Sequence, residues 1–515
     1  MLTSTRYRVA TPPRKVVSFI LASSFFGIIF FLCLSLIPSP RQPKHSFQNQ
    51  TIIADSNREA DASHLPTSIE TIAKNFTLHP LNGPNFKYVF GELGQRVQAL
   101  TPWILEAQSQ PTSNTADNPL LALAENLTVT QFPFLRNPKQ PDDQTPVTTL
   151  RSTYVIGSQG IVIPVRPNNF RFSVHLILNL NSVLKSRLPI QIVYAGDDGL
   201  PSHRRRRLLE IDRDIEFLDI LTIFDNNIMG LEGEWAIKPF AALASTFESV
   251  ILIDADAVFL QKPEVLFEHT GFKETGAKFF HDRLLFQHSY QGRHKWWKEQ
   301  LGKQVPSEML MKSLVWNEDY AEEADSGVVV LDKSRLPTFM GLLHVCWQNT
   351  KAVRESVTYK ITYGDKESWW FGLELCGAPY AFEWQYGGAI GKFRYKDNRG
   401  EICGFAVAHS DDQDRIVWYN GSLLKNKAVD EIEFDWPEQY MLDGSWIKGN
   451  SKEDVSCMTG GTIRDSFCDM IHPETIKSPS DADFLLEMRL TPEQQHAIRK
   501  SIELAERADE EHSLI

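Results

Sequence analysis

The stretch Val250-Ile-Leu-Ile-Asp254-Ala-Asp256-Ala-Val-Phe-Leu260 decides the fold expected for this chain. An uninterrupted apolar run is typical of a strand that is buried on both faces of a parallel sheet, and this run leads directly into two aspartates spaced i, i+2. If the backbone stays extended, both carboxylates point to one side. Open α/β sheets bind ligands at the carboxyl ends of their strands, so this pair marks the expected functional edge of the sheet.

The sequence around this stretch alternates between strand and helix patterns. Strands are expected at 160–164, 190–194, 249–254 and 327–331, and helices at 176–184, 235–247 and 336–347. A strand, a helix and a strand in close succession make a βαβ unit, which implies a parallel sheet with helices on its faces. The predicted fold class is therefore α/β and Rossmann-like from about 150 to 450. Further on, Thr491-Pro-Glu-Gln494 has the residues of a capping box and predicts a charged, peripheral helix to about Glu511.

The amino terminus contains an apolar segment, Val16–Ile37, with no charged residue. At about 1.5 Å per helical residue it can cross the roughly 30 Å hydrocarbon core of a bilayer. Four positive charges precede the segment and two follow it, which places the amino terminus in the cytoplasm. We expect an uncleaved anchor; a cleaved signal peptide is the alternative, although the segment is longer than most signal peptides.

These features predict a type II membrane protein with five parts. They are a cytoplasmic tail (1–15), a transmembrane helix (16–37), a stem and N-terminal lumenal region (38–150), a catalytic domain (151–450) and a C-terminal extension with a terminal helix (451–515). A lumenal body offers four N-glycosylation sequons, at Asn49, Asn75, Asn126 and Asn420. Five cysteines follow the anchor, so at most two intrachain disulfides can form, and the spacing does not select the pairs.

The charge of the chain restricts its ligands. Its 515 residues include 53 Lys+Arg and 65 Asp+Glu, for a net charge of −12. Because duplex binding needs clustered basic residues, we expect no nucleic-acid partner. Two nearby carboxylates repel each other, and Mg²⁺ or Mn²⁺ would remove that cost and could bridge to a diphosphate. Asp-x-Asp also arises by chance as ordinary turn chemistry. This cation hypothesis would be contradicted if the two aspartates turned to separate partners, or if no cavity lay beside them.

Seven blocks of sequence follow one another in a specific order. They are ILIDADAVFLQKPEVLF (251–267), TGAKFFHDR (275–283), EADSGVVVLDKSR (323–335), TYKITYGDKESWWFGLEL (358–375), YGGAIG (386–391), ICGFAVAH (402–409) and WYNGSLLKNK (418–427). Together they resemble the fungal α-1,3-mannosyltransferase family of Golgi type II enzymes, over about 155–430. The resemblance implies a GT-A fold, a GDP-mannose donor, Mn²⁺ or another divalent cation, and retention of the anomeric configuration.

The resemblance also implies roles for individual residues. Asp254 and Asp256 match the family's Asp-x-Asp and would hold the metal against the donor diphosphate. His409 fits the C-terminal histidine that often completes the metal shell, and a capping or surface histidine is the alternative. Lys238 would place a cation near the diphosphate, unless it is a solvated helix lysine. Asp325 would contact the donor sugar or merely cap the strand that follows.

The segment 364–371 supplies the remaining candidates. Asp365 and Glu367 are expected as catalytic residues at the pocket mouth, where they would bind sugar hydroxyls, and Lys366 as a donor-binding residue. Alternatively, Asp365 is the N-cap of a helix that continues to Leu375. One of the tryptophans at 369 and 370 is a candidate wall for a sugar face, with core packing as the alternative.

The function expected from these residues is transfer of mannose from GDP-mannose to a mannose hydroxyl of a protein-linked glycan. The partners are then the nucleotide-sugar donor, the glycan acceptor, the Golgi membrane through one helix, and further copies or other Golgi transferases. No nucleophile is identifiable, so same-face attack is preferred over a covalent intermediate. Two alternatives stay open: a lumenal transferase that uses a UDP-sugar, and a catalytically silent glycan-binding protein of the same fold.

Overall fold

The computed structural model describes residues 67–109 (without 82 and 84), 118–231, 235–396, 399–459 and 489–512. These residues all lie in the unit Ser63–Ile515. Within them, no helix is both long enough and apolar enough to cross a membrane. The expected tail, the expected anchor, the sequon at Asn49 and Cys468 fall outside the described residues.

The main sheet of the described part has seven strands in the order β3-β2-β1-β4-β7-β6-β8. They are β1 (Val155–Pro164), β2 (Ile190–Tyr194), β3 (Glu216–Asp219), β4 (Phe247–Ile253), β6 (Ala277–His281), β7 (Ala324–Asp332) and β8 (Ala381–Phe382). β1 to β4 are parallel to one another, whereas β7 is antiparallel to β4 and to β6. The predicted α/β class is confirmed, and the expectation of a sheet that is parallel throughout is wrong at β7.

The reversed strand has a direct consequence for the functional edge. β7 begins where β4 ends, because Ile253 pairs with Val328 in the antiparallel register. The backbone N–H of Asp254 also donates to the carbonyl of Gly327 at 2.8 Å. The first residues of β7 therefore lie beside the Asp-x-Asp segment.

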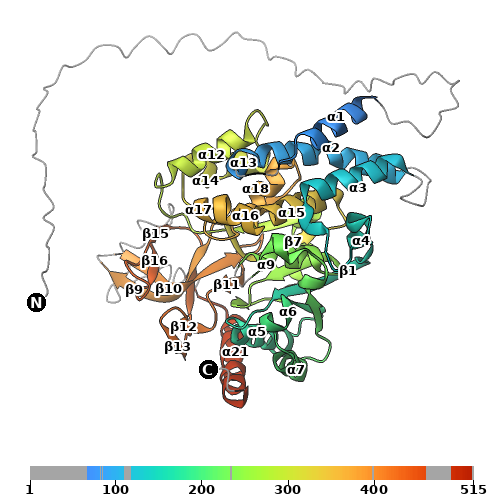
Figure 1. Cartoon of the computed structure of the whole chain (residues 1–515). Helices are drawn as coiled ribbons and strands as arrows, with labels where there is room; N and C mark the ends of the chain where they lie inside the picture. The colour runs from blue at the N-terminus through green and yellow to red at the C-terminus, as the bar shows by residue number, and fades with distance from the viewer. Residues whose placement is uncertain are drawn as a thin grey trace, which may run out of the picture. The chain divides into compact units, whose positions relative to one another are not determined.

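Both faces of the main sheet are covered, as the apolar run at 250–253 predicts. Val250 and Leu252 belong to one hydrophobic cluster, and Ile251 and Ile253 to another. Figure 1 shows the helices of the first cluster, α2, α3, α15 and α18, gathered on one side, and α5 and α7 on the other. The side-chain alternation of a strand sends successive residues into the two cores.

Helices of the α/β body lie close to their expected positions. α5 (Phe170–Ile177) continues through a π-helical turn, Leu178–Val183, and α9 (Ile237–Ala244) is shorter than expected because Phe247 already belongs to β4. α15 (Leu336–Gln348) and α18 (Ser368–Leu375) complete the first face. The other helices between residues 196 and 361 are α6 (Gly196–Gly199), α7 (Ser202–Ile211), α8 (Asn226–Met229), α10 (Val265–Glu268), α11 (Thr270–Thr275), α12 (Gln291–Leu301), α13 (Glu308–Lys312), α14 (Leu314–Glu318), α16 (Lys351–Val353) and α17 (Tyr359–Ile361).

A second sheet adjoins the first through the Asp-x-Asp segment. Its core order is β14-β9-β10-β11-β5, with β15 and β16 attached, and all its pairings are antiparallel. The strands are β5 (Ala257–Phe259), β9 (Gly388–Lys396), β10 (Arg399–Ser410), β11 (Ile416–Asn420), β14 (Gln439–Met441), β15 (Ser445–Ile447) and β16 (Ser456–Thr459). A separate hairpin joins β12 (Leu424–Asn426) to β13 (Asp430–Phe434). The chain thus passes from the main sheet to the second sheet within residues 254–256.

The region before 150 and the C-terminal helix are both part of the α/β body. α1 (Thr67–Leu78), α2 (Phe90–Ser109), α3 (Pro119–Gln131) and α4 (Pro146–Ser152) supply residues to the same cluster as α15 and α18. α21 (Pro492–His512) begins with the predicted capping box: Thr491 Oγ1 and Gln494 Oε1 accept from each other's backbone N–H at 3.2 and 3.0 Å. The expectation that this helix is peripheral is wrong, because Ile498 and Ile502 are buried and Asp509 bonds to α5.

Candidate active site

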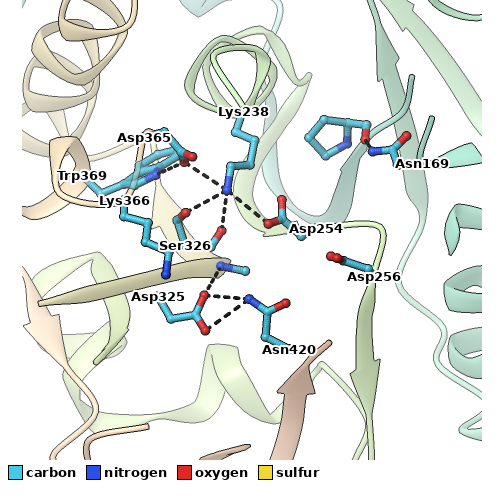
Figure 2. A network of polar contacts seen from close by, with 12 residues as sticks. Asn169, Lys238, Asp254, Asp256, Asp325, Ser326, Asp365, Lys366, Trp369 and Asn420 are labelled. Atoms are coloured by element: carbon cyan, nitrogen blue, oxygen red, sulfur yellow. Dashed lines mark hydrogen bonds and ion pairs between the residues drawn. The ribbon is translucent and has the colours of Figure 1, made fainter. Parts of the chain in front are cut away.

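The Asp-x-Asp segment turns instead of staying extended. The backbone N–H of Ala257 donates to the carbonyl of Asp254 at 3.0 Å, which closes a turn between β4 and β5. The expected shared direction of the two carboxylates is therefore wrong. Asp254 Oδ2 lies 3.2 Å from Lys238 Nζ, and Asp256 pairs with Lys427. Both side chains are about a quarter exposed, at 26% and 23%, so both remain accessible at the sheet edge (Figure 2).

Lys238 is the buried cation at the centre of this edge. Its side chain is 4% exposed, and α9 aims it at Asp254 and at Asp365, whose Oδ2 lies 3.1 Å from Nζ. Nζ also donates to Oγ and to the carbonyl of Ser326, at 2.8 and 3.1 Å. Burial lowers the pKa of Lys238, but the two carboxylates outweigh burial and raise it above its usual value. The alternative of a solvated helix lysine is wrong.

Asp254, the accessible partner of Lys238, has a raised pKa. Burial raises the pKa of Asp254 to about 7; Lys238 opposes the shift, and Asp256 and Asp365 add to it. Three carboxylates thus face two lysines at this edge, Lys238 and Lys427. The excess negative charge favours a further cation.

Asp365 and Glu367 are both 1% exposed, so neither lies at a pocket mouth. Asp365 Oδ2 accepts from the indole N–H of Trp369 at 2.8 Å. Because α18 begins at Ser368 with Glu367 before it, the expectation that Asp365 is the N-cap is wrong. Trp369 and Trp370 are fully buried, so core packing holds for both and neither forms a sugar wall.

Glu367 is bonded to the chain itself. Its Oε1 accepts from the backbone N–H groups of Glu323 and Ala324 at 3.0 and 3.3 Å, and its Oε2 from the indole N–H of Trp370 at 2.6 Å. Burial raises the pKa of Glu367 to about 8. This carboxyl group anchors the start of β7, and the geometry contradicts the expected contact with a sugar.

Lys366 points away from Lys238, to a second group of acids. It pairs with Asp282, and its Nζ lies 3.8 Å from Glu322 Oε2. Burial opposes the charge on Lys366, but the neighbouring carboxylates raise its pKa. The side chain is 19% exposed, which leaves it accessible to a ligand.

Asp325, at the start of β7, is hydrogen-bonded to residues of the second sheet. His409 Nε2 lies 3.0 Å from Asp325 Oδ2, and the amide of Asn420 donates to both carboxylate oxygens at 2.9 and 3.2 Å (Figure 2). Burial raises the pKa of Asp325, but His409 and Lys366 together bring it below its usual range. Asp325 therefore joins the two sheets across the site. Its Oδ1 also accepts from the backbone N–H of Gly327 at 2.9 Å, in agreement with the capping alternative, and both oxygens are occupied by groups of the chain instead of a sugar.

His409 does not reach the Asp-x-Asp segment. Its ring stacks on Trp418 with 4.2 Å between centroids and meets the edge of Phe280 at 5.4 Å. The ring is 1% exposed, and its Nε2 faces Asp325. The geometry thus supports neither the metal-ligand role nor the surface alternative, and His409 instead positions Asp325.

The predicted donor set fits a divalent cation only in part. Asp254 and Asp256 offer accessible carboxylate oxygens, which suit Mg²⁺ or Mn²⁺. Among the described residues, two groups bring three potential ligand atoms within 4.8 Å of one another, and neither contains these aspartates. One group includes Cys403 and Cys457, which form a disulfide. The other is His269 with Glu383 and Asp412, and there Lys278 already pairs with both acids.

A narrow crevice lies next to one of the two aspartates. It has a volume of about 10 Å³ and lies between α5 and the segment that contains Asp256. Lys427 pairs with the same carboxylate, so a cation that binds Asp256 must compete with Lys427. A cavity of about 480 Å³ lies elsewhere, against α4, and contains none of the predicted site residues. The separate lysine partners and the narrow crevice weigh against the cation hypothesis in its simplest form.

Two further residues of the site come from the block 418–427. Asn420 was expected only as a glycosylation acceptor, and the geometry contradicts that role because its amide nitrogen is bonded to Asp325. Lys427 follows seven residues later and reaches Asp256. The sequence offered one signal for Asn420 and Lys427: both lie in the block WYNGSLLKNK (418–427), which is part of the resemblance to the mannosyltransferase family. By contrast, the sequon residues Asn75 and Asn126 are exposed on α1 and α3.

Comparison with known proteins finds similarity to mannosyltransferases over about half of the chain. The model of the family described as "Mannosyltransferase putative" matches residues 158–411. Alpha-1,3-mannosyltransferase MNN1 of Saccharomyces cerevisiae is 24% identical over 347 residues, which are 57% of this chain and 44% of that protein. Alpha-1,3-mannosyltransferase MNT3 of the same yeast is 27% identical over 294 residues, which are 49% and 44%. The chain thus spans less than half the length of these relatives.

Among solved structures, the mannosyltransferase Ktr4p from S. cerevisiae is 12% identical and matches 62% of this chain and 84% of its own, with a TM-score of 0.31. Its complex with GDP gives a TM-score of 0.28. These scores are too low to assign any residue. The matched region 158–411 contains Lys238, the Asp-x-Asp pair, Asp325 and His409. In this region the chain is similar to the mannosyltransferase family and to the yeast α-1,3-mannosyltransferases.

Proposed function

We propose that this chain transfers mannose from GDP-mannose to a mannose hydroxyl of a protein-linked glycan, forming an α-1,3 bond with retention of configuration. One observation carries the proposal: in the region similar to mannosyltransferases, Lys238 and Asp365 meet Asp254 of the Asp-x-Asp turn at the carboxyl end of β4. A ligand site at that position is typical of open α/β sheets. The mixed sheet flanked by helices is consistent with the GT-A fold that we propose for this region.

A divalent cation, Mn²⁺ by preference, is proposed at Asp254 and Asp256. When bound, it would neutralise the two carboxylates and stabilise the negative charge on the departing diphosphate. The excess of carboxylates over lysines at this edge supports a cation there. His409 is left out of the proposed ligand set, because its ring faces Asp325.

The lysines prepare the edge for a diphosphate. Lys238 forms ion pairs with Asp254 and Asp365, and its raised pKa keeps it protonated. A bound donor diphosphate would therefore lie near a fixed positive charge. Lys427 is 34% exposed, and once it leaves Asp256 its ammonium group is free to bind phosphate oxygens. Donor binding and the release of Lys427 are therefore coupled.

The hydrogen bonding of the buried carboxylates bears on how the configuration would be retained. A covalent intermediate needs an enzyme carboxylate with a free oxygen close to the sugar. The carboxylates of Asp325, Asp365 and Glu367 are all held by donors of the chain. This supports attack on the same face as departure.

We propose a Golgi membrane location, with the apolar segment 16–37 as the anchor and the body in the lumen. The Cys403–Cys457 disulfide supports an oxidising compartment, and the exposed Asn75 and Asn126 are accessible to glycans. Association with other Golgi transferases is proposed on the resemblance alone.

The test is radiolabelled transfer by the fragment 63–515 with α-mannobiose as acceptor, with GDP-mannose and UDP-sugars compared in parallel. We expect product from GDP-mannose only, an α-1,3 linkage by NMR, and loss of product in EDTA that Mn²⁺ restores. Product from a UDP-sugar alone would establish the alternative donor, and full activity in EDTA would remove the metal.

The Asp256→Asn variant separates the enzyme from a silent binding protein. A transferase loses turnover in this variant, whereas a glycan-binding protein keeps its affinity for mannobiose and shows no turnover in either form. Glu433→Gln serves as a matched control, because Glu433 pairs with Lys425, whereas Asp256 pairs with Lys427.

A further inference from the structure

Two aromatic side chains are exposed next to the charged cluster. Trp235 is 40% exposed and Tyr363 is 62% exposed, and their ring centroids lie 5.4 Å apart at an interplanar angle of 45°. Trp235 precedes α9, which carries Lys238, and Tyr363 precedes the loop that carries Asp365 and Lys366. The two elements that build the buried cluster thus also bring these rings together above it.

The backbone fixes this pair against the site. The carbonyl of Trp235 accepts from the N–H of Lys238 at 3.1 Å. Gly364 has a φ of +65°, and a Cβ on it would lie 2.9 Å from the Trp235 ring. Glycine at 364 therefore permits both the turn and the close packing of the indole, so Trp235 is held in position although much of its ring is open.

Polar groups adjoin the two rings. Lys366 Nζ lies 6.0 Å from the centroid of the Tyr363 ring and pairs with Asp282, with Glu322 at 3.8 Å. Lys366 is 19% exposed and Glu322 is 26% exposed. Apolar ring faces beside a few accessible polar groups are typical of small-ligand sites. A pyranose presents the matching chemistry, with a C–H face for the rings and hydroxyls for the charged groups.

We propose that Trp235 and Tyr363 form the subsite that binds a mannose unit of the acceptor glycan; this rests on the proposed transferase function. We place the donor diphosphate at Asp254 and Asp256, and Lys238 Nζ lies between Asp254 and Asp365 (Figure 2). Trp235 lies three residues before Lys238, and Tyr363 lies two residues before Asp365, so the rings belong to the two segments that form this ion pair. A sugar bound to the rings would therefore lie beside the segments that hold the proposed donor site.

The test compares Trp235→Ala and Tyr363→Ala with the wild-type fragment 63–515. Both rings are partly exposed, so we expect both variants to fold, with a lower thermal unfolding temperature for Trp235→Ala because its indole packs against Gly364. The KM for α-mannobiose should rise about fivefold to tenfold, as loss of an aromatic contact predicts, while the KM for GDP-mannose stays within about twofold. Trp235→Phe and Tyr363→Phe should recover most of the acceptor affinity. Trp436→Ala is the matched control, because Trp436 is 43% exposed and lies between β13 and β14.

Two kinetic results would overturn the subsite. One is an unchanged acceptor KM in both alanine variants; the other is a raised KM for GDP-mannose, which would assign the rings to the nucleotide base. If the wild-type fragment shows no transfer at all, the proposed function fails, and saturation-transfer NMR with α-mannobiose then decides the subsite separately. A sugar signal that both alanine variants abolish supports the subsite, and no signal with the wild type contradicts it.

Discussion

Ion pairs with a buried lysine fix the positions of Asp254 and Asp365 at the sheet edge. The ammonium group of Lys238 forms ion pairs with two carboxylates and donates a hydrogen bond to Ser326 Oγ. Its positive charge compensates the buried negative charge of Asp365. Burying one charge without a partner costs far more than a matched pair. The identity of residue 238 is therefore fixed by stability as well as by any contact with a donor.

Replacing Lys238 by methionine tests this charge balance. The variant leaves Asp254 and Asp365 facing each other without a cation, and we expect a loss of about 3–5 kcal/mol in the free energy of unfolding, measured in urea. The double variant Lys238→Met, Asp365→Asn should recover part of the loss, because one of the two charges is gone. Equal stability of Lys238→Met and the wild type would contradict the ion-pair assignment.

Glu367 predicts a pH dependence of stability. Its pKa is raised to about 8 in the fold, chiefly by burial, from an ordinary value near 4.5. Between these two values the folded chain holds a proton that the unfolded chain has lost, so raising the pH from about 4.5 to 8 removes stability, by a few kcal/mol in total. Below this window the neutral carboxyl costs nothing, and above it the full penalty is present.

The Glu367→Gln variant isolates this contribution. Its side chain does not titrate, so the unfolding free energy of wild type minus variant should fall steadily between about pH 5 and 8 and level off above. Thermal unfolding at five pH values measures the difference. A difference that does not change with pH would show that Glu367 stays ionised in the fold.

At the scale of elements, the reversed direction of β7 builds the site. Because β7 starts where β4 ends, Asp325 and Ser326 reach the edge that holds Asp254. α21 supports the same edge from behind: Ser501 bonds to Asn179, whose amide also bonds to the carbonyl and the N–H of Phe259 in β5. The strand that follows the Asp-x-Asp turn is thus braced by a helix far away in the sequence.

The disulfide between Cys403 and Cys457 ties β10 to β16 across a separation of 54 residues. Cross-linking a loop of that length is expected to stabilise the fold by about 4 kcal/mol through the unfolded chain. We expect dithiothreitol to lower the urea midpoint of the wild type and to leave that of Cys403→Ala, Cys457→Ala unchanged. A response of the double variant to reductant would assign the effect to another cysteine.

The elements also show how much the sequence could predict. The apolar runs located β2, β4 and β7 and the helix α15, because burial on both faces leaves a clear signal in the composition of a strand. The direction of β7 left no such signal, since it depends on the path of the chain between β6 and β7. The partners of Asp325 are 84 and 95 residues away, at His409 and Asn420, and no local pattern could have joined them.

At the scale of the whole molecule, the three sequons within the described residues differ in their surroundings. Asn75 and Asn126 are exposed, whereas the amide of Asn420 is bonded to Asp325, and a glycan on that nitrogen would break the bond. In the protein secreted from a eukaryotic host we expect glycans at Asn75 and Asn126 and none at Asn420. Mass spectrometry after peptide-N-glycosidase treatment measures the occupancy, and occupancy at Asn420 would contradict the position assigned to its side chain.

The passage of the chain between two sheets at residues 254–256 has a mechanical consequence. Asp254 belongs to the end of one sheet and Asp256 to the start of the other, and Asp325 links the same two sheets through Asn420. A tilt of one sheet against the other would alter the distance between the two aspartates. A ligand bound by both Asp254 and Asp256 would connect the two sheets and restrict their relative movement. Substitutions in the core of the second sheet would consequently lower the affinity for that ligand without contacting it.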